Sequence, residues 1–293
     1  MGNQKSLSDS LTDGFIIIVM LGLMLITAYP IIYVILASVS DGTELMKHTG
    51  FLYKSFGFHL DAYYKVFGNP NILIGYGNTI FVVIAALAVS MSITAMTAYV
   101  LSRKQVFWNK IFIFVIVLTM FFNGGLIPFY LIVKNVGLMN SLWALILPFA
   151  VNTFNLIIMR TAFMSVPDSL EESAKIDGAN HFVILTRIII PLSLPVLAVM
   201  SLYYAVEKWN GWFYASLFLK DRNLFPLQLI LREILISNST DSMLGGGSID
   251  TAVQISESIK YATIVVATLP ILCMYPFVQK YFVKGVMVGA LKG

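Results

Sequence analysis

The sequence has few charged residues and only one cysteine. Charged side chains make up 12% of its 293 residues and apolar side chains 58%, whereas about a quarter of the residues of a soluble domain are usually charged. This composition excludes an ordinary soluble domain and indicates a protein that crosses a membrane several times. Because Cys273 is the single cysteine, no disulfide can form within the chain.

Motifs of several functional classes are also missing. No G-x-x-x-x-G-K-[ST] phosphate loop occurs, so we do not expect the chain to bind ATP itself. His48, His59 and His181 lack metal-ligand spacing, and no nucleophile–base pair is recognisable. We therefore expect no catalytic residue, no metal and no bound cofactor. No basic stripe with interleaved aromatic residues indicates nucleic-acid binding.

Six apolar segments are long enough to cross a membrane, which takes about 20 residues per helix. They cover residues 14–37, 76–101, 110–133, 141–164, 185–206 and 261–283. The sequence predicts an all-α membrane protein with six transmembrane helices in one domain, 14–283, flanked by segment 1–13 and tail 284–293. A secondary carrier or channel is the rival class, but it would show buried ionisable residues or repeated halves, and neither is evident.

Positive residues orient the predicted spans. The loop after the second span contains Arg103, Lys104 and Lys110, whereas the loop after the third contains only Lys134. Short cytoplasmic loops are enriched in Lys and Arg. We therefore expect both termini, and the loop 165–191 between spans four and five, on the cytoplasmic side.

Local signals predict a short helix at 168–177 within this loop. Ser165 and Asp168 have the spacing of a capping box, and Pro167 suits a first helical turn. Gly178 stands where a helix commonly ends in a left-handed conformation. The alternative is a surface helix in the headgroup layer, but acidic first turns and few large apolar residues argue against it.

The predicted helix has two kinds of face. Four residues recur at helical spacing on one of them: Leu170, Ser173, Ala174 and Asp177. The small side chains among them allow another surface to approach closely. Glu171 can pair with Lys175 along the outer side, which leaves Glu172 for a cation on a partner. These positions predict a helix that docks on another protein.

The same loop resembles the signature of ATP-binding-cassette importer permeases, E-A-A-x3-G-x9-I-x-L-P. Here the pattern reads Glu172-Ser173-Ala174, Gly178 and Ile188-Ile189-Ile190-Pro191, with Ser173 for alanine and Ile190 for leucine. Further stretches are similar to the carbohydrate-uptake branch of the family, in particular to the smaller permease of oligosaccharide importers, of which the alginate-oligosaccharide importer is one candidate. These stretches are Ile127–Tyr130, Gly137–Pro148, Trp209-Asn210, Phe225–Leu227 and Lys284–Gly293.

The resemblance implies a bacterial inner-membrane protein with several partners. A companion permease would complete a heterodimeric pore, two ATPase subunits would bind ATP and Mg²⁺, and an extracytoplasmic solute-binding protein would deliver the sugar. A permease of the same superfamily for an amino acid or phosphate is the main rival. The ATPase-coupling residues implied by the match are Glu171, Glu172, Ser173, Ala174, Asp177 and Gly178.

Polar residues inside the spans are candidates for the translocation path, because polar groups in lipid are costly unless they face protein or water. The candidates are Asn123, Asn152, Asn155 and Tyr203. Hydrogen bonding between helices is the favoured alternative for each asparagine, and an interfacial aromatic belt is the alternative for Tyr203. Gly124, Gly125 and Pro128 should distort the third span.

The outer segment 207–260 is too long for a simple connection, and loops of this length are often functional. By analogy with the family, we expect it to contact the solute-binding protein through a tip at Gly245, Gly246 and Gly247. Packing against the companion permease is the alternative.

Overall fold

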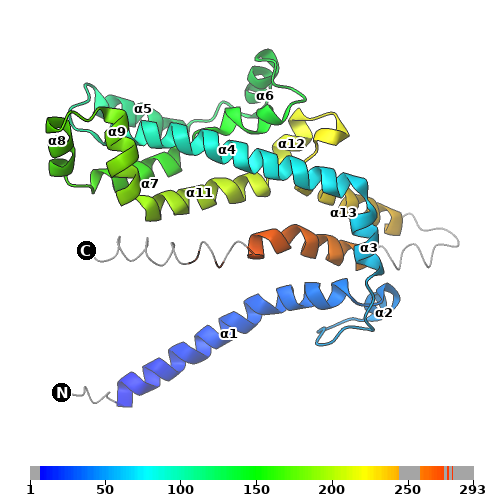
Figure 1. Ribbon diagram of the computed structural model, residues 1–293. Helices are drawn as coiled ribbons and strands as arrows, with labels where there is room; N and C mark the ends of the chain where they lie inside the picture. The colour runs from blue at the N-terminus through cyan, green and yellow to red at the C-terminus, as the bar shows by residue number, and fades with distance from the viewer. Residues whose placement is uncertain (1–6, 244–257, 274–275, 277–278, 280–293) are drawn as a thin grey trace. The chain divides into compact units, whose positions relative to one another are not determined.

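Every regular element in the described part of the chain, residues 7–243, 258–273, 276 and 279 of the computed structural model, is a helix (Figure 1). The predicted all-α fold is confirmed. The contacts divide the chain into two units, one formed by residues 1–69 and 233–268, the other by residues 70–232 and 269–293.

The first unit contains α1 (Leu7–Ser38), α2 (Gly42–Lys47) and α3 (Asp61–Gly68). Ala37, Leu45 and Leu52 form its small buried cluster. The Asp41 carboxylate caps α2, because it accepts hydrogen bonds from the amides of Thr43 and Glu44 at 2.9 and 3.2 Å. The Glu44 amide is the main reason that the pKa of Asp41 is lowered.

The second unit holds most of the remaining helices. In chain order they are α4 (Pro70–Ser102), α5 (Asn109–Phe121), α6 (Leu126–Asn135), α7 (Thr153–Met164), α8 (Asp168–Ile176), α9 (His181–Ile184), α10 (Ile190–Leu192), α11 (Leu194–Trp209) and α12 (Phe213–Phe218). A π-helical stretch, Leu185–Ile189, joins α9 to α10, and 3-10 turns cover Leu142–Leu145, Leu147–Phe149 and Arg222–Leu224. α13 (Leu227–Met243) and the helix Ser258–Cys273 have residues in both units.

The predicted spans divide into unbroken and broken helices. The first two are single helices, α1 and α4. The third to fifth are pairs of helices bent by 115° between α5 and α6, by 50° before α7 and by 88° before α11. The sixth corresponds to the helix Ser258–Cys273 as far as it is described. The sequence predicts six spans with a distortion in the third, and the structure interrupts the fourth and fifth as well.

Local chemistry explains the breaks. Gly125, which follows the end of α5, adopts φ +87°. Its backbone amide donates a hydrogen bond to the Asn123 side-chain oxygen at 2.9 Å. This turn confirms the predicted distortion of the third span. Pro148 lies just before the second break. The third break is at Ser193, between two prolines that each remove a helix hydrogen bond.

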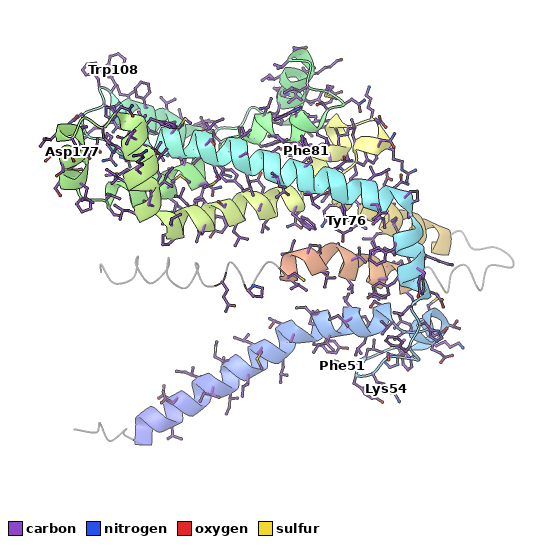
Figure 2. The ribbon with its side chains drawn as sticks, in the orientation of Figure 1. Phe51, Lys54, Tyr76, Phe81, Trp108 and Asp177 are labelled. Atoms are coloured by element: carbon purple, nitrogen blue, oxygen red, sulfur yellow. The ribbon has the colours of Figure 1, made fainter. Side chains whose placement is uncertain are left out.

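α4 is the central helix of its unit, and it packs against α7 and α11. Its Tyr76 and Phe81 rings lie 6.3 and 6.1 Å from the rings of Trp209 and Trp143 (Figure 2). A buried apolar cluster formed by α4, α7, α11 and the segment after α8 includes Ala98, Phe163, Ile184, Ile189 and Met200. The cluster includes residues before and after α8, such as Val166 and Ile184, and so holds both ends of this helix in place.

The outer segment is partly folded. The Asn78 amide donates to the carbonyls of Asn223 and Phe225 at 2.7 and 3.1 Å, and the Leu227 amide donates to the Thr79 hydroxyl at 2.8 Å. These bonds attach the start of α13 to α4. The predicted loop 207–260 thus contains α12 and α13, while Gly245, Gly246 and Gly247 lie outside the described residues.

Candidate functional site

α8 is a nine-residue helix at one end of its unit (Figure 1), and it matches the predicted docking helix to within one residue. The predicted capping box is wrong. Pro167 occupies the N-cap without a side-chain bond, and the Ser165 hydroxyl donates to the carbonyl of Ala162 at 2.7 Å instead. The helix start is thus set by the proline backbone and by Asp168 in the first turn, which the helix dipole favours.

The end of α8 follows the expectation for Gly178. This residue has φ +81°, and its amide donates to the carbonyl of Lys175 at 3.0 Å. The amide of Ala179 donates to the carbonyl of Ala174 at 2.9 Å. This pair of bonds is a Schellman motif, in which glycine takes the left-handed position at little cost. The turn directs the chain back into the apolar cluster.

Glu171 faces inward, which differs from the expected outer position. Its side chain is 7% exposed, and its carboxylate forms an ion pair with Arg103 at the end of α4. Lys175 pairs with the same carboxylate at 3.0 Å, as the spacing predicted. The Tyr99 hydroxyl also donates to it at 3.4 Å. Glu171 therefore binds α8 to its own subunit.

Arg103 connects three helices. Besides the Glu171 carboxylate, its guanidinium donates to the Phe163 carbonyl of α7 at 3.2 Å, and it lies 5.0 Å from the centre of the Tyr99 ring. The Arg103 side chain is 13% exposed. A charge this buried is costly without its partner, so the Arg103–Glu171 pair acts as a clamp between α4, α7 and α8.

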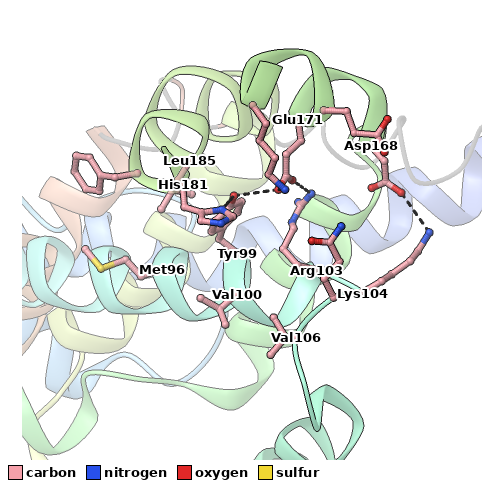
Figure 3. A pocket seen from close by; sticks show the side chains of 14 residues that line it. Met96, Tyr99, Val100, Arg103, Lys104, Val106, Asp168, Glu171, His181 and Leu185 are labelled. Carbon is pink, nitrogen blue, oxygen red and sulfur yellow. Dashed lines mark hydrogen bonds and ion pairs between the residues drawn. The ribbon is translucent and has the colours of Figure 1, made fainter. Parts of the chain in front are cut away.

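His181 extends the clamp toward α9. Its Nδ1 lies 2.9 Å from the Tyr99 hydroxyl, which also contacts Glu171 (Figure 3). When the hydroxyl donates to the carboxylate, the bond to the imidazole requires a proton on Nδ1. Both sides of the turn at Gly178 are thereby tied to α4.

Other residues of α8 are exposed. These are Glu172, Ser173 and Asp177, while Ala174 is partly buried against the apolar cluster. Glu172 is thus the exposed acidic residue of the helix centre, and it lines a pocket beside α4 together with the buried Glu171. The residues predicted to dock on a partner therefore fall into two groups. Glu172, Ser173 and Asp177 are exposed, whereas Glu171 and Ala174 attach α8 to the rest of its unit.

A pocket of about 580 Å³ lies between α4 and the α8–α9 segment (Figure 3). Met96, Val100 and Leu185 contribute apolar surface, while Arg103 and Glu171 contribute their paired charges. Among the described residues, no group of His, Cys, Asp and Glu could hold a metal ion. The pocket thus combines an apolar wall with the buried Arg103–Glu171 ion pair.

Asn123 and Asn152, two of the residues proposed for the translocation path, form local side-chain hydrogen bonds. Asn152 caps α7, since its side chain accepts from the Asn155 amide at 3.2 Å, and its own amide donates to the Tyr204 hydroxyl at 3.0 Å. Asn155 is buried and Tyr203 is exposed. Together with the turn at Asn123, these contacts match the alternative that the polar residues stabilise helix packing and breaks.

Tyr99, Arg103 and His181 belong to this site, but the sequence alone does not assign them to it. Arg103 was used only to orient the loops, Tyr99 was one apolar position of a span, and His181 was considered only as a metal ligand. Arg103 is 68 residues from Glu171 in the sequence, and Tyr99 is 82 residues from His181. The sequence offers one signal for Arg103: it is a cation at the end of the second predicted span, on the same predicted side of the membrane as the acidic helix 168–177.

The all-helical fold and its long apolar helices define a protein of the integral membrane class. Residues 106–288 match the family model of the binding-protein-dependent transport system inner membrane component, and the chain belongs to this family. The resemblance to importer permeases of the ATP-binding-cassette class is thereby confirmed.

Similar proteins share nearly the whole chain. The polygalacturonan/rhamnogalacturonan transport system permease protein YtcP of Bacillus subtilis is 43% identical over 99% of this chain and 100% of its own. Protein LplC of the same organism is 42% identical over 93% and 92%. A solved bacterial ABC transporter for import of the acidic polysaccharide alginate contains a chain with TM-score 0.85 and 33% identity, covering 96% of this chain and 100% of that one.

Proposed function

We propose that the chain is the permease subunit of an ATP-driven, binding-protein-dependent importer of sugars or oligosaccharides in a bacterial inner membrane. A companion permease completes the pore as a heterodimer, and both termini face the cytoplasm. Membership of the inner membrane component family and the sugar-related names of the similar permeases support this proposal. The positive residues of the loop after α4 support the orientation.

The two-faced arrangement of α8 is the observation that carries the coupling proposal. The exposed residues Glu172, Ser173 and Asp177 dock in a groove of an ATPase subunit, and Glu172 meets a cation there. The Arg103–Glu171 clamp transmits movement of the docked helix to α4 and α7. ATP and Mg²⁺ are bound by the ATPase subunits. Closure of those subunits then shifts the permease between conformations as rigid helices.

Charge reversal at Glu172 tests this docking. In a reconstituted transporter, Glu172→Lys should abolish ATPase association or transport-coupled hydrolysis, because it places a cation opposite a cation. The control is Asp168→Asn, which removes an exposed negative charge of α8 whose partner Lys104 is on the same chain, without placing a cation at the positive end of the helix. Normal coupling in the Glu172 variant, or equal loss in both variants, would contradict the proposed surface.

The solute is proposed to be a carbohydrate, and acidic oligosaccharides are the first class to test because the solved relative imports alginate. The outer segment, including Gly245, Gly246 and Gly247, contacts the solute-binding protein. Asn155 and Tyr203 remain candidates for the path. Hydrolysis by the complete transporter should rise with an acidic oligosaccharide and its binding protein; stimulation only by an amino acid or phosphate would favour the rival substrate class.

A further inference from the structure

The turn between α4 and α5 is rigidly built. The Asn109 side-chain amide donates to the carbonyls of Leu101 and Arg103 at 3.0 and 2.8 Å, so it closes the turn from inside. The guanidinium of Arg160 donates to the same Leu101 carbonyl at 2.8 Å. Three hydrogen bonds to two carbonyls therefore stabilise the conformation of the turn.

Two large aromatic residues are displayed on this turn. The side chains of Phe107 and Trp108 belong to residues that are 80% and 60% exposed, and their rings stack with centroids 5.6 Å apart and planes 25° apart. Trp108 adopts φ +61°. A left-handed conformation costs a bulky residue roughly 1–3 kcal/mol, and the hydrogen bonds of Asn109 and Arg160 hold the turn that carries it. The apolar area of the two rings is left exposed, which is unfavourable in water.

The surroundings point to lipid. The aromatic pair lies between the end of α4 and the start of α5, and Trp108 is at the same end of the unit as Asp177 (Figure 2). Exposed Lys104 and Lys110 flank it on the two sides. Aromatic rings concentrate at the headgroup level of membranes, and lysines beside them extend their amines toward phosphates. α5, which follows directly, has no buried residue within this chain.

We propose that the 103–110 turn is an interfacial anchor, with Phe107 and Trp108 inserted in the headgroup layer of the lipid bilayer. The anchor begins at Arg103, the residue that clamps α8. It therefore fixes the depth of the clamp relative to the membrane surface. The proposal rests on membrane insertion of α4 and α5 and does not require ATPase docking, so either idea can fail without the other.

Lipid-borne quenchers test the anchor directly. The complete transporter is reconstituted in phosphatidylcholine–phosphatidylglycerol nanodiscs, with or without phosphatidylcholine brominated near the headgroup. Subtracting the emission of Trp108→Phe from that of the unmodified transporter isolates the signal of Trp108. That signal should be strongly quenched by the brominated lipid and weakly by aqueous iodide. Trp108→Tyr provides a second subtraction in case the first variant assembles poorly.

Trp209 is the matched control, because it is 9% exposed within the same unit. The signal removed by Trp209→Phe should resist both quenchers. Quenching of Trp108 by iodide alone would place the pair in water and overturn the proposal. Protection from both quenchers would place it under a partner subunit, which would overturn it equally.

Discussion

The clamp between Arg103 and Glu171 can be tested by removing one charge. Glu171→Gln keeps the size of the side chain but leaves the Arg103 guanidinium, 13% exposed, without an anionic partner; its other hydrogen bonds go to the neutral Ser102 hydroxyl and Phe163 carbonyl. Breaking a buried ion pair from one side costs about 3–5 kcal/mol. Because the adjoining pocket admits water, we expect the lower end, about 3 kcal/mol, for the attachment of α8.

Hydrogen exchange of the α8 amides measures this cost. A loss of about 3 kcal/mol corresponds to roughly 100-fold faster exchange through local opening, since each 1.4 kcal/mol is a factor of ten. Coupled hydrolysis should fall in the same variant while basal hydrolysis by the ATPase subunits persists. The cause is a docking helix that no longer moves with α4.

Two further variants separate the clamp from a general effect of charge. Glu172→Gln changes an exposed neighbour and should alter exchange in α8 by no more than about 0.5 kcal/mol. Replacing both partners, with Arg103→Met and Glu171→Leu, removes the uncompensated charge and should restore most of the protection. Equal effects of the two glutamine variants, or a double variant no better than Glu171→Gln, would refute the clamp.

Three other changes address the supporting structure. Gly178→Val should destabilise the α8 turn by roughly 1–2 kcal/mol because φ is +81° there, and unchanged exchange of α8 would contradict this. A Cβ on Gly75 would lie 3.1 Å from the Leu227 Cα, so Gly75→Ala should lower thermal stability, whereas Gly77→Ala, which meets nothing within 4 Å, should not. Because the pKa of Asp41 is lowered, its ionised side chain stabilises α2 at any pH above the ordinary carboxyl pKa. This stabilisation is lost as the pH falls through the lowered pKa. Amide protection in α2 should fall accordingly, but not in Asp41→Asn, which caps without titrating.

Local patterns were sufficient for the elements. Apolar runs located the spans because burial in lipid requires length and hydrophobicity, which are properties of consecutive residues. The breaks near Gly125 and the turn at Gly178 were also readable, since glycine conformation is a local property. The capping box is wrong because Pro167, which has no side-chain acceptor, occupies the N-cap of α8. Prolines also stand at the breaks before α7 and α11, but they lie inside continuous apolar runs, and the length of these runs predicts uninterrupted spans.

The sequence by itself determined the membrane fold, the position of α8 and the family to which the signature belongs. Only the tertiary structure decided which of two adjacent glutamates is buried. Neighbouring residues of a helix point about 100° apart, and the spacing to Lys175 gives Glu171 a local partner without placing it inside or outside. The choice is made by Arg103, 68 residues away in the chain, because a buried guanidinium must have a carboxylate beside it.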